Sequence, residues 1–159
     1  MGMSLSMPTS LDAATGMLMF GALFMTLWLG VVALMADLGG WSEVARDFPA
    51  HEYPTAGERM TVSSLMFGRG WVSLGSYRYA VTIILGSRGF ELWTKLPFQY
   101  QHPGISVPWG SVRAYEKGKT FGRTFIEITL SQGQHFTIRG RSATALIQAL
   151  ARAAARPEV

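Results

Sequence analysis

A basic loop that contains one aromatic residue is the part of this sequence best suited to binding chemistry. The stretch KGKTFGR, residues 117–123, places three cations around one ring: Lys117, Lys119 and Arg123 around Phe121. Cations beside an exposed aromatic side chain suit an anionic lipid surface, where each charge contributes about 1 kcal/mol. The same charges also fit an ordinary solvated turn. We predict a lipid- or anion-binding loop, with the solvated turn as the alternative.

Arg88, in the turn GSRG at residues 86–89, is a further candidate for this anion-binding site. If residues 105–116 form one bent strand, the two loops lie at the same end of the sheet. If Gly110 breaks that stretch into two strands, the loops lie at opposite ends. The sequence leaves both arrangements open.

The sequence lacks the residue patterns that catalysis and metal or nucleotide binding require. It has no cysteine, and its histidines show no ligand spacing: His51, His102 and His135. Residues 118–120 imitate the end of a phosphate-binding loop, but Arg113 stands where the first glycine is required. We find no nucleophile elbow and no suggestive acidic pair. We therefore expect a non-enzymatic protein without metal or cofactor.

An uncharged apolar segment near the N-terminus predicts a transmembrane helix. Residues 13–36 carry no charged side chain, and at ~1.5 Å per residue they form a helix of roughly 36 Å, enough to cross a hydrocarbon core of about 30 Å. A secretory signal peptide needs a basic flank and a shorter apolar core. Here Asp12 precedes the segment and no good cleavage site follows. We predict a retained single-pass helix behind an N-terminal tail at residues 1–12.

Charge divides the chain into an acidic and a basic part. Residues 1–59 carry two basic and six acidic side chains, a net charge of −4, whereas the rest carries twelve and four, a net charge of +8. Lys and Arg are absent before the apolar segment, so the positive-inside rule predicts a cytoplasmic C-terminal domain on the cell (inner) membrane. The basic part favours anionic partners.

One face of the predicted helix carries small residues at a spacing of four: Ala22, Thr26 and Gly30. Small residues at this spacing let two membrane helices approach closely. They are also common in membrane helices generally. The stripe predicts a contact with a partner helix or with a second copy of this chain.

Residues 37–59 form a predicted juxtamembrane connector. Gly39 and Gly40 end the first helix, and Ser42 is a candidate cap for a short helix ending near Phe48. Its apolar stripe contains Trp41, Val44, Ala45 and Phe48. Because its polar face is acidic, we expect this helix to pack on the following domain rather than on lipid.

From residue 60 the pattern changes to short β segments closed by one helix. Residues 78–85 pair with 90–96 through the turn at 86–89, and residues 124–131 pair with 135–140. Weaker patterns cover 61–67 and 70–75. A helix over 143–155, capped by Ser142, should pack its apolar face on the sheet. The expected inward residues are Tyr79, Val81, Ile83, Leu85, Ile126, Ile128, Leu130, Phe136, Ile138, Ala143, Leu146, Ile147, Leu150 and Ala154.

The order of these elements resembles a bacterial pleckstrin-homology-like (PH/GRAM-like) domain. The resemblance rests on "GFELW", on "HPGISVPWGSV", and on an apolar-Pro-Trp element at residues 107–109 followed by Val112. It implies, over residues 60–156, a mainly β fold: a bent antiparallel sheet of about seven strands closed by a C-terminal helix. Pro108 would mark the corner of the sheet, where proline is tolerated, and Trp109 would fill the core beneath it.

The sequence thus predicts a membrane-anchored, non-catalytic binding module. Its expected partners are the bilayer, anionic lipid headgroups or a membrane protein. The alternative is a structural or accessory subunit of a larger membrane complex. Nucleic acid is not an expected partner, because the basic part lacks the interleaved aromatic platform of such proteins.

Overall fold

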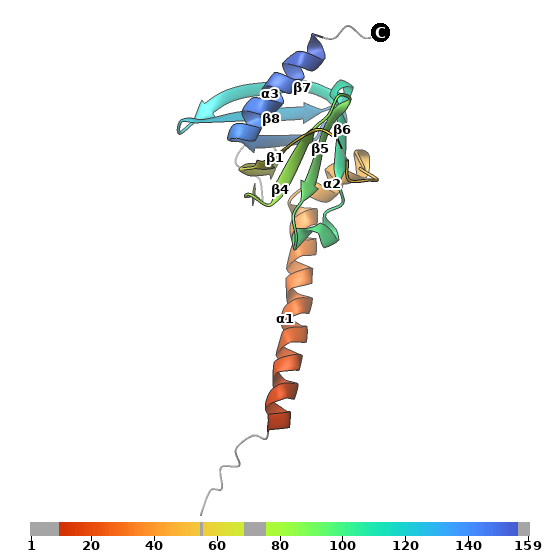
Figure 1. Ribbon diagram of the computed structural model, residues 1–159, viewed down its shortest axis with the longest axis vertical. Helices are drawn as coiled ribbons and strands as arrows, with labels where there is room; N and C mark the ends of the chain where they lie inside the picture. The colour runs from red at the N-terminus through yellow and green to blue at the C-terminus, as the bar shows by residue number, and fades with distance from the viewer. Residues whose placement is uncertain (1–9, 55, 69–75, 156–159) are drawn as a thin grey trace, which may run out of the picture.

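One long helix enters a compact β domain from below (Figure 1). The computed structural model describes residues 10–54, 56–68 and 76–155. Helix α1 spans Ser10–Leu38 and contains the whole predicted apolar segment. Between Asp12 and Leu38 it is long and apolar enough to cross a membrane, and nearly all of it is exposed.

The domain consists of two antiparallel sheets. In one, β1 (Glu58–Val62), β4 (Val81–Leu85), β5 (Gly89–Thr94) and β6 (Ile105–Pro108) lie in the order β1-β4-β5-β6. In the other, β3 (Ser76–Tyr77), β2 (Ser64–Phe67), β9 (His135–Arg139), β8 (Arg123–Leu130) and β7 (Val112–Thr120) lie in the order β3-β2-β9-β8-β7. The predicted fold class is confirmed, with nine strands in the described residues rather than about seven.

Both predicted hairpins are present. In β4 and β5, Leu85 pairs with Phe90 around the 86–88 turn, and in β8 and β9, Thr129 pairs with His135. The predicted segment 61–67 divides into β1 and β2, one in each sheet. The predicted strand at 70–75 lies outside the described residues. The prediction for Tyr79 is wrong: β4 begins only at Val81, and Tyr79 has a φ of +55° and is 62% exposed.

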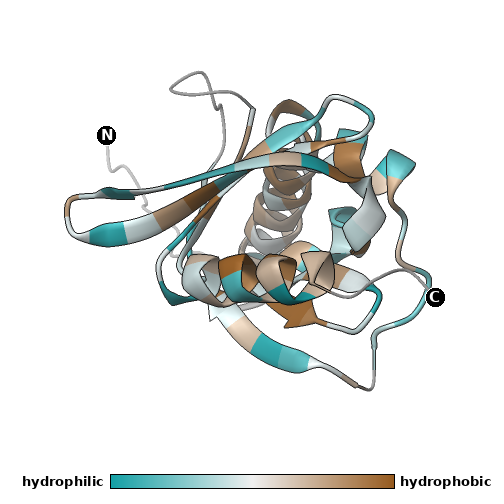
Figure 2. Cartoon of the chain, turned by 90° about the horizontal axis from the view of Figure 1, so that it is seen from above, coloured by the Kyte–Doolittle hydropathy of each residue, from teal (hydrophilic) through white to brown (hydrophobic). Residues whose placement is uncertain are grey.

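The core lies between the two sheets under helix α3 (Arg141–Ala154). Figure 2, which looks along α1, shows α3 lying across the domain. Ala143, Leu146 and Leu150 are buried as predicted, because the helix period brings one face inward. The prediction for Ala154 is wrong: it is exposed in the last turn of the helix. The predicted cap Ser142 is wrong: the N-cap is Gly140, and Ser142 is buried inside the first turn.

Helix α2 (Trp41–Asp47) belongs to the same core. Its apolar stripe is buried, so the predicted packing of the connector on the domain is confirmed: Trp41, Val44, Ala45 and Phe48. The predicted cap Ser42 is wrong, because Gly40, with a φ of +79°, precedes the helix. The chain then runs beside β6, where the Ser106 N–H donates to the Phe48 carbonyl at 2.9 Å.

The chain passes from one sheet to the other at Pro108, as the sequence predicts. Strand β6 ends there, a short 3₁₀ turn η2 (Trp109–Ser111) follows, and β7 begins at Val112. Because β6 lies at the edge of its sheet, the missing N–H of Pro108 leaves no ladder bond unmade. Trp109 does not fill the core: it is partly exposed, packs on Phe90 at a ring distance of 5.6 Å, and donates its Nε1–H to the Ser87 carbonyl.

Candidate functional site

The β7–β8 hairpin carries the predicted anion-binding loop and projects past the rest of the domain (Figure 2). Its pairing runs from Val112 with Leu130 to Thr120 with Arg123. The turn between them consists of Phe121 and Gly122, with φ values of +49° and +74°. Two positive φ values define the turn that matches the twist of a hairpin, for which Asn-Gly is the preferred sequence.

Neither the backbone conformation nor burial favours a phenylalanine at position 121. A bulky residue with positive φ is strained by roughly 1–3 kcal/mol. Its side chain is also fully exposed, at 101%, so it gains no burial that would offset the strain. Phe121 strains the backbone and exposes an apolar ring, so it does not stabilise the fold. Such a residue is a candidate for binding a partner.

The cations around Phe121 divide between the two faces of the hairpin. Directly paired residues of antiparallel strands share a face. Lys117 pairs with Ile126, and Lys119 pairs with Thr124, so both lysines lie on the face that further along the sheet covers the core. Arg123 pairs with Thr120 on the opposite face, which also carries Glu116 and Glu127. The lysine face is therefore the uniformly basic one.

Arg88 does not join this loop. The Arg88 carbonyl accepts the N–H of Trp109 at 3.0 Å, which places the 86–88 turn beside the corner between the sheets. Strand β7 starts at that corner and runs away from it over nine residues, about 30 Å. The two-strand alternative thus holds, and the predicted site separates into a hairpin tip and a distant turn.

Figure 1 shows how the tip lies relative to α1. The hairpin points sideways from the domain, above the level at which α1 enters it. A bilayer crossed by α1 would meet the lower side of the domain, not the hairpin tip.

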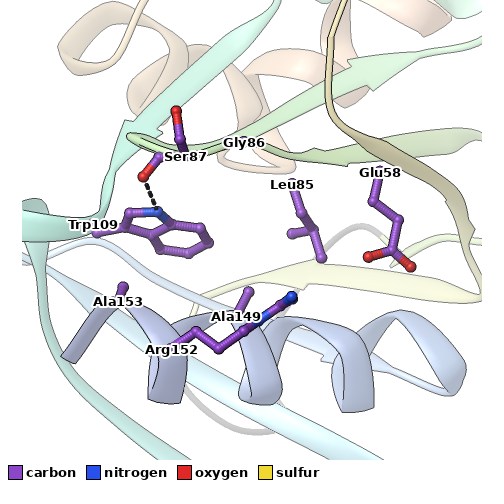
Figure 3. A pocket seen from close by; sticks show the side chains of 8 residues that line it. All are labelled: Glu58, Leu85, Gly86, Ser87, Trp109, Ala149, Arg152 and Ala153. Carbon is purple, nitrogen blue, oxygen red and sulfur yellow. Dashed lines mark hydrogen bonds between the residues drawn. The ribbon is translucent and has the colours of Figure 1, made fainter. Parts of the chain in front are cut away.

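A small cavity lies between α3 and the β4–β5 turn. Figure 3 shows Trp109, Glu58 and Arg152 facing one space, whose volume is about 240 Å³. This volume is below the range of about 300–1,000 Å³ typical of ligand pockets. A larger groove of about 780 Å³ follows the outer side of the first sheet, with Arg88 and Glu91 among its lining residues. Ser87 and a carboxylate line each hollow, Glu58 in the first and Glu91 in the second, but in the described residues no hydrogen bond joins the hydroxyl to either carboxylate.

A buried polar cluster, which no pattern in the sequence predicts, lies where α1 meets the domain. The Tyr77 hydroxyl lies 2.9 Å from Nε2 of His102 and 3.2 Å from the carbonyl of Met35 in α1. Nδ1 of His102 lies 2.9 Å from the carbonyl of Phe98. Burial raises the pKa of Tyr77 to about 12 and lowers the pKa of His102. Both groups are therefore neutral at pH 7, and the cluster joins α1 to the domain rather than supplying reactive groups.

The predicted small-residue stripe of α1 remains exposed. The hydroxyl of Thr26 donates to the Ala22 carbonyl at 2.9 Å, and nothing lies within 4 Å of a Cβ built on Gly30. Gly30 stands about 200° around the helix from Val32, which faces the domain. The stripe is therefore not used by this chain's own domain.

Within the described ranges no three His, Cys, Asp or Glu side chains are grouped to hold a metal ion. No protein-family model matches this chain, and no curated protein is significantly similar to it.

Proposed function

We propose that this protein is a membrane-anchored binding module without catalytic activity, and that the β7–β8 tip recognises its partner. Helix α1 would hold the domain at the cytoplasmic face of the cell membrane. Tethering raises the effective concentration of the tip for partners in the same bilayer, so a modest contact is sufficient. Phe121, strained and exposed between cations, is the observation that carries the proposal.

The partner that fits best is a membrane protein with an apolar pocket rimmed by acidic side chains. Phe121 would fill the pocket, and Lys117 and Lys119 would meet the carboxylates. The sideways direction of the hairpin supports a neighbouring protein over lipid headgroups, because a bilayer crossed by α1 lies below the domain (Figure 1). Edge strands often carry lysine to prevent aggregation, which accounts for the charges but not for the phenylalanine.

The exposed stripe on α1 supports a related role as an accessory subunit. Ala22, Thr26 and Gly30 face away from the domain and would let α1 lie against a partner helix. The two contacts are compatible: the helix would bind within the membrane while the hairpin binds outside it. The resemblance to PH-like domains is consistent with a binding role, since two sheets closed by a C-terminal helix form the described domain.

Photo-crosslinking in native membranes tests the proposal. A benzoyl-phenylalanine in place of Phe121 should yield a discrete protein adduct. The same group in place of Gln148, exposed on α3, should not. Changing Lys117 and Lys119 to glutamine should weaken the Phe121 adduct. Adducts with lipid alone, or the same adducts from both positions, would contradict a protein partner.

The Phe121→Asn substitution should separate binding from stability. Asparagine suits the positive φ at this position, so the free energy of unfolding should rise by about 1 kcal/mol. Affinity for the partner should fall about 30-fold, the loss expected for an aromatic hot-spot residue. Urea denaturation and co-purification from solubilised membranes measure the two effects.

Tyr79→Asn is the matched control. Tyr79 is also exposed and also has a positive φ, but it lies outside the hairpin. The Tyr79→Asn variant should have a higher free energy of unfolding and an unchanged affinity for the partner. Equal loss of binding in both variants would show that Phe121 has no specific role.

A further inference from the structure

The loop between β5 and β6 lies against α1. It includes the 3₁₀ turn η1 (Phe98–Gln101), which contacts α1 directly. The rings of Phe98 and Trp28 lie 6.3 Å apart. Further along α1, Val32 and Ala36 are buried by the domain, with exposures of 1% and 2%. The loop therefore extends along α1 toward its N-terminus, one turn beyond the residues that the rest of the domain buries.

The length of α1 places this contact at the boundary of a bilayer. Residues 13–36 of α1 carry no charge. A hydrocarbon core of about 30 Å that starts at Asp12 ends near Val32, at a rise of ~1.5 Å per residue. Trp28 then lies just inside that boundary, where tryptophan is enriched in membrane proteins. Since Phe98 contacts Trp28, the loop must lie at the same depth.

The exposed side chains of the loop suit that depth. Leu96 is 81% exposed and Tyr100 is 71% exposed, although side chains of this size and apolar character are usually buried in a protein core. Tyrosine places its ring in apolar surroundings and its hydroxyl in water, which favours the interfacial region. The loop backbone is internally bonded: the Phe98 N–H donates to the Lys95 carbonyl at 2.9 Å, and His102 binds the Phe98 carbonyl. This reduces the number of polar groups that would face lipid.

We propose that Leu96, Phe98 and Tyr100 enter the interfacial region of the bilayer that α1 crosses. Together with Trp28 they form a second membrane contact, which fixes the tilt of the domain and keeps the β7–β8 hairpin above the membrane surface. The inference rests on the proposed function in one respect, that α1 spans the membrane. The occupant of this surface is lipid, because α1 leads directly from the loop into the bilayer.

Single cysteine variants of the full chain test this contact, since the chain has no cysteine of its own. Each variant is labelled with the environment-sensitive dye NBD and reconstituted into phosphatidylcholine vesicles. Leu96→Cys reports on the loop, Leu23→Cys on α1, and Ser87→Cys on the exposed β4–β5 turn. The dye at Leu96 should show blue-shifted emission and weak quenching by aqueous iodide. Lipid-borne nitroxides should quench it most strongly when they sit near the headgroups.

The three positions separate the two proposals. Iodide should quench the dye at Ser87 strongly and the dye at Leu23 hardly at all. If Leu23 is protected but Leu96 is as accessible as Ser87, α1 spans the bilayer and the loop contact is overturned. If Leu23 is also accessible, the membrane anchor itself is overturned, and the loop contact with it.

A charge introduced in the loop gives an independent measurement. Leu96→Asp should raise the iodide quenching of a dye at Tyr100→Cys at least threefold, because a carboxylate disfavours insertion. Gln148→Asp, an equal change of charge on exposed α3, should leave it unchanged. Equal quenching in all three backgrounds would overturn the contact.

Discussion

The Tyr77 hydroxyl has one hydrogen and two neighbouring acceptors, the Met35 carbonyl and Nε2 of His102. The protonation state of His102 decides which of the two receives that hydrogen. The Nδ1 of His102 must carry a hydrogen to bind the Phe98 carbonyl. In the neutral ring, Nε2 then accepts the hydrogen of Tyr77. Protonation of His102 would turn Nε2 into a donor and direct the hydroxyl toward Met35, at 3.2 Å, while adding a buried charge.

Stability should therefore depend on this histidine. Burial lowers the pKa of His102 below its ordinary value of about 6.5, so the folded state binds fewer protons than the unfolded state. The contribution of His102 is complete above that value and is lost as the pH falls below it. Urea midpoints at pH 8 and pH 5 should differ less in His102→Gln than in the unchanged protein. His51→Gln, at an exposed position, should leave that difference intact.

Among the described residues Trp41 is the largest fully buried side chain, and its indole makes both a hydrogen bond and ring contacts. Its Nε1–H donates to the Pro103 carbonyl at 2.8 Å, and its ring lies 5.3–5.7 Å from those of Phe67, Tyr77 and His102. Trp41→Phe should lower the free energy of unfolding by about 1 kcal/mol for the lost hydrogen bond, with an added loss of packing. Trp41→Ala should lower it by about 3–5 kcal/mol. Urea denaturation measures both, and similar midpoints for the two variants would contradict this role.

Alternation and turn residues made the strands around the two hairpins predictable. Buried Ile126, Ile128 and Leu130 follow a period of two, and glycine-containing turns separate the paired runs. Helix starts were not predictable in the same way. Both candidate caps, Ser42 and Ser142, lie one residue inside their helices, because glycines with positive φ redirect the chain just before them.

Contacts between distant parts of the chain were beyond the reach of local patterns. The basic residues of the β7–β8 loop were identified from sequence, but their division between two faces follows from the register of the pairing. The separation of Arg88 from that loop depends on the break at residues 109–111. Likewise, Trp28 and Phe98 lie 70 positions apart, so no window of the sequence contains their contact.

Helix α2 makes the folded unit longer than its strands suggest. A fragment of residues 40–155 should unfold cooperatively, whereas one of residues 57–155, which keeps all of β1, lacks Trp41, Val44, Ala45 and Phe48 from the core. It also loses the backbone bonds that Phe48 and Ala50 form beside β6. Near-ultraviolet circular dichroism and urea denaturation should show lost tertiary signal and a broader transition for the shorter fragment. Equal midpoints and slopes would mean that α2 is dispensable.

The helix and the domain move as one body only if the junction between them holds. Val32 and Ala36 pack on the domain, Trp28 contacts the η1 turn, and the Tyr77 hydroxyl lies 3.2 Å from the carbonyl of Met35. These contacts follow one face of α1 over its last three turns, at a spacing of four residues, so they restrict the direction of the helix rather than serving as a flexible hinge. The loop contact with lipid and the hairpin contact with a partner both need this rigidity, since the tilt of α1 sets where the loop and the hairpin lie.

A larger side chain in the junction should loosen the packing of α1 on the domain. Ala36 is almost completely buried, so Ala36→Leu adds volume where no space exists, at a cost of about 1–3 kcal/mol. Spin labels at Leu23→Cys and Ser87→Cys should give a narrow distance distribution by double electron–electron resonance in nanodiscs. Ala36→Leu should broaden that distribution, because α1 then adopts several directions relative to the domain. Leu34→Ala, at an exposed position two residues away, should leave it narrow. Equally narrow distributions in both variants would show that the chain turn at Gly39 and Gly40, rather than side-chain packing, sets the direction of the helix.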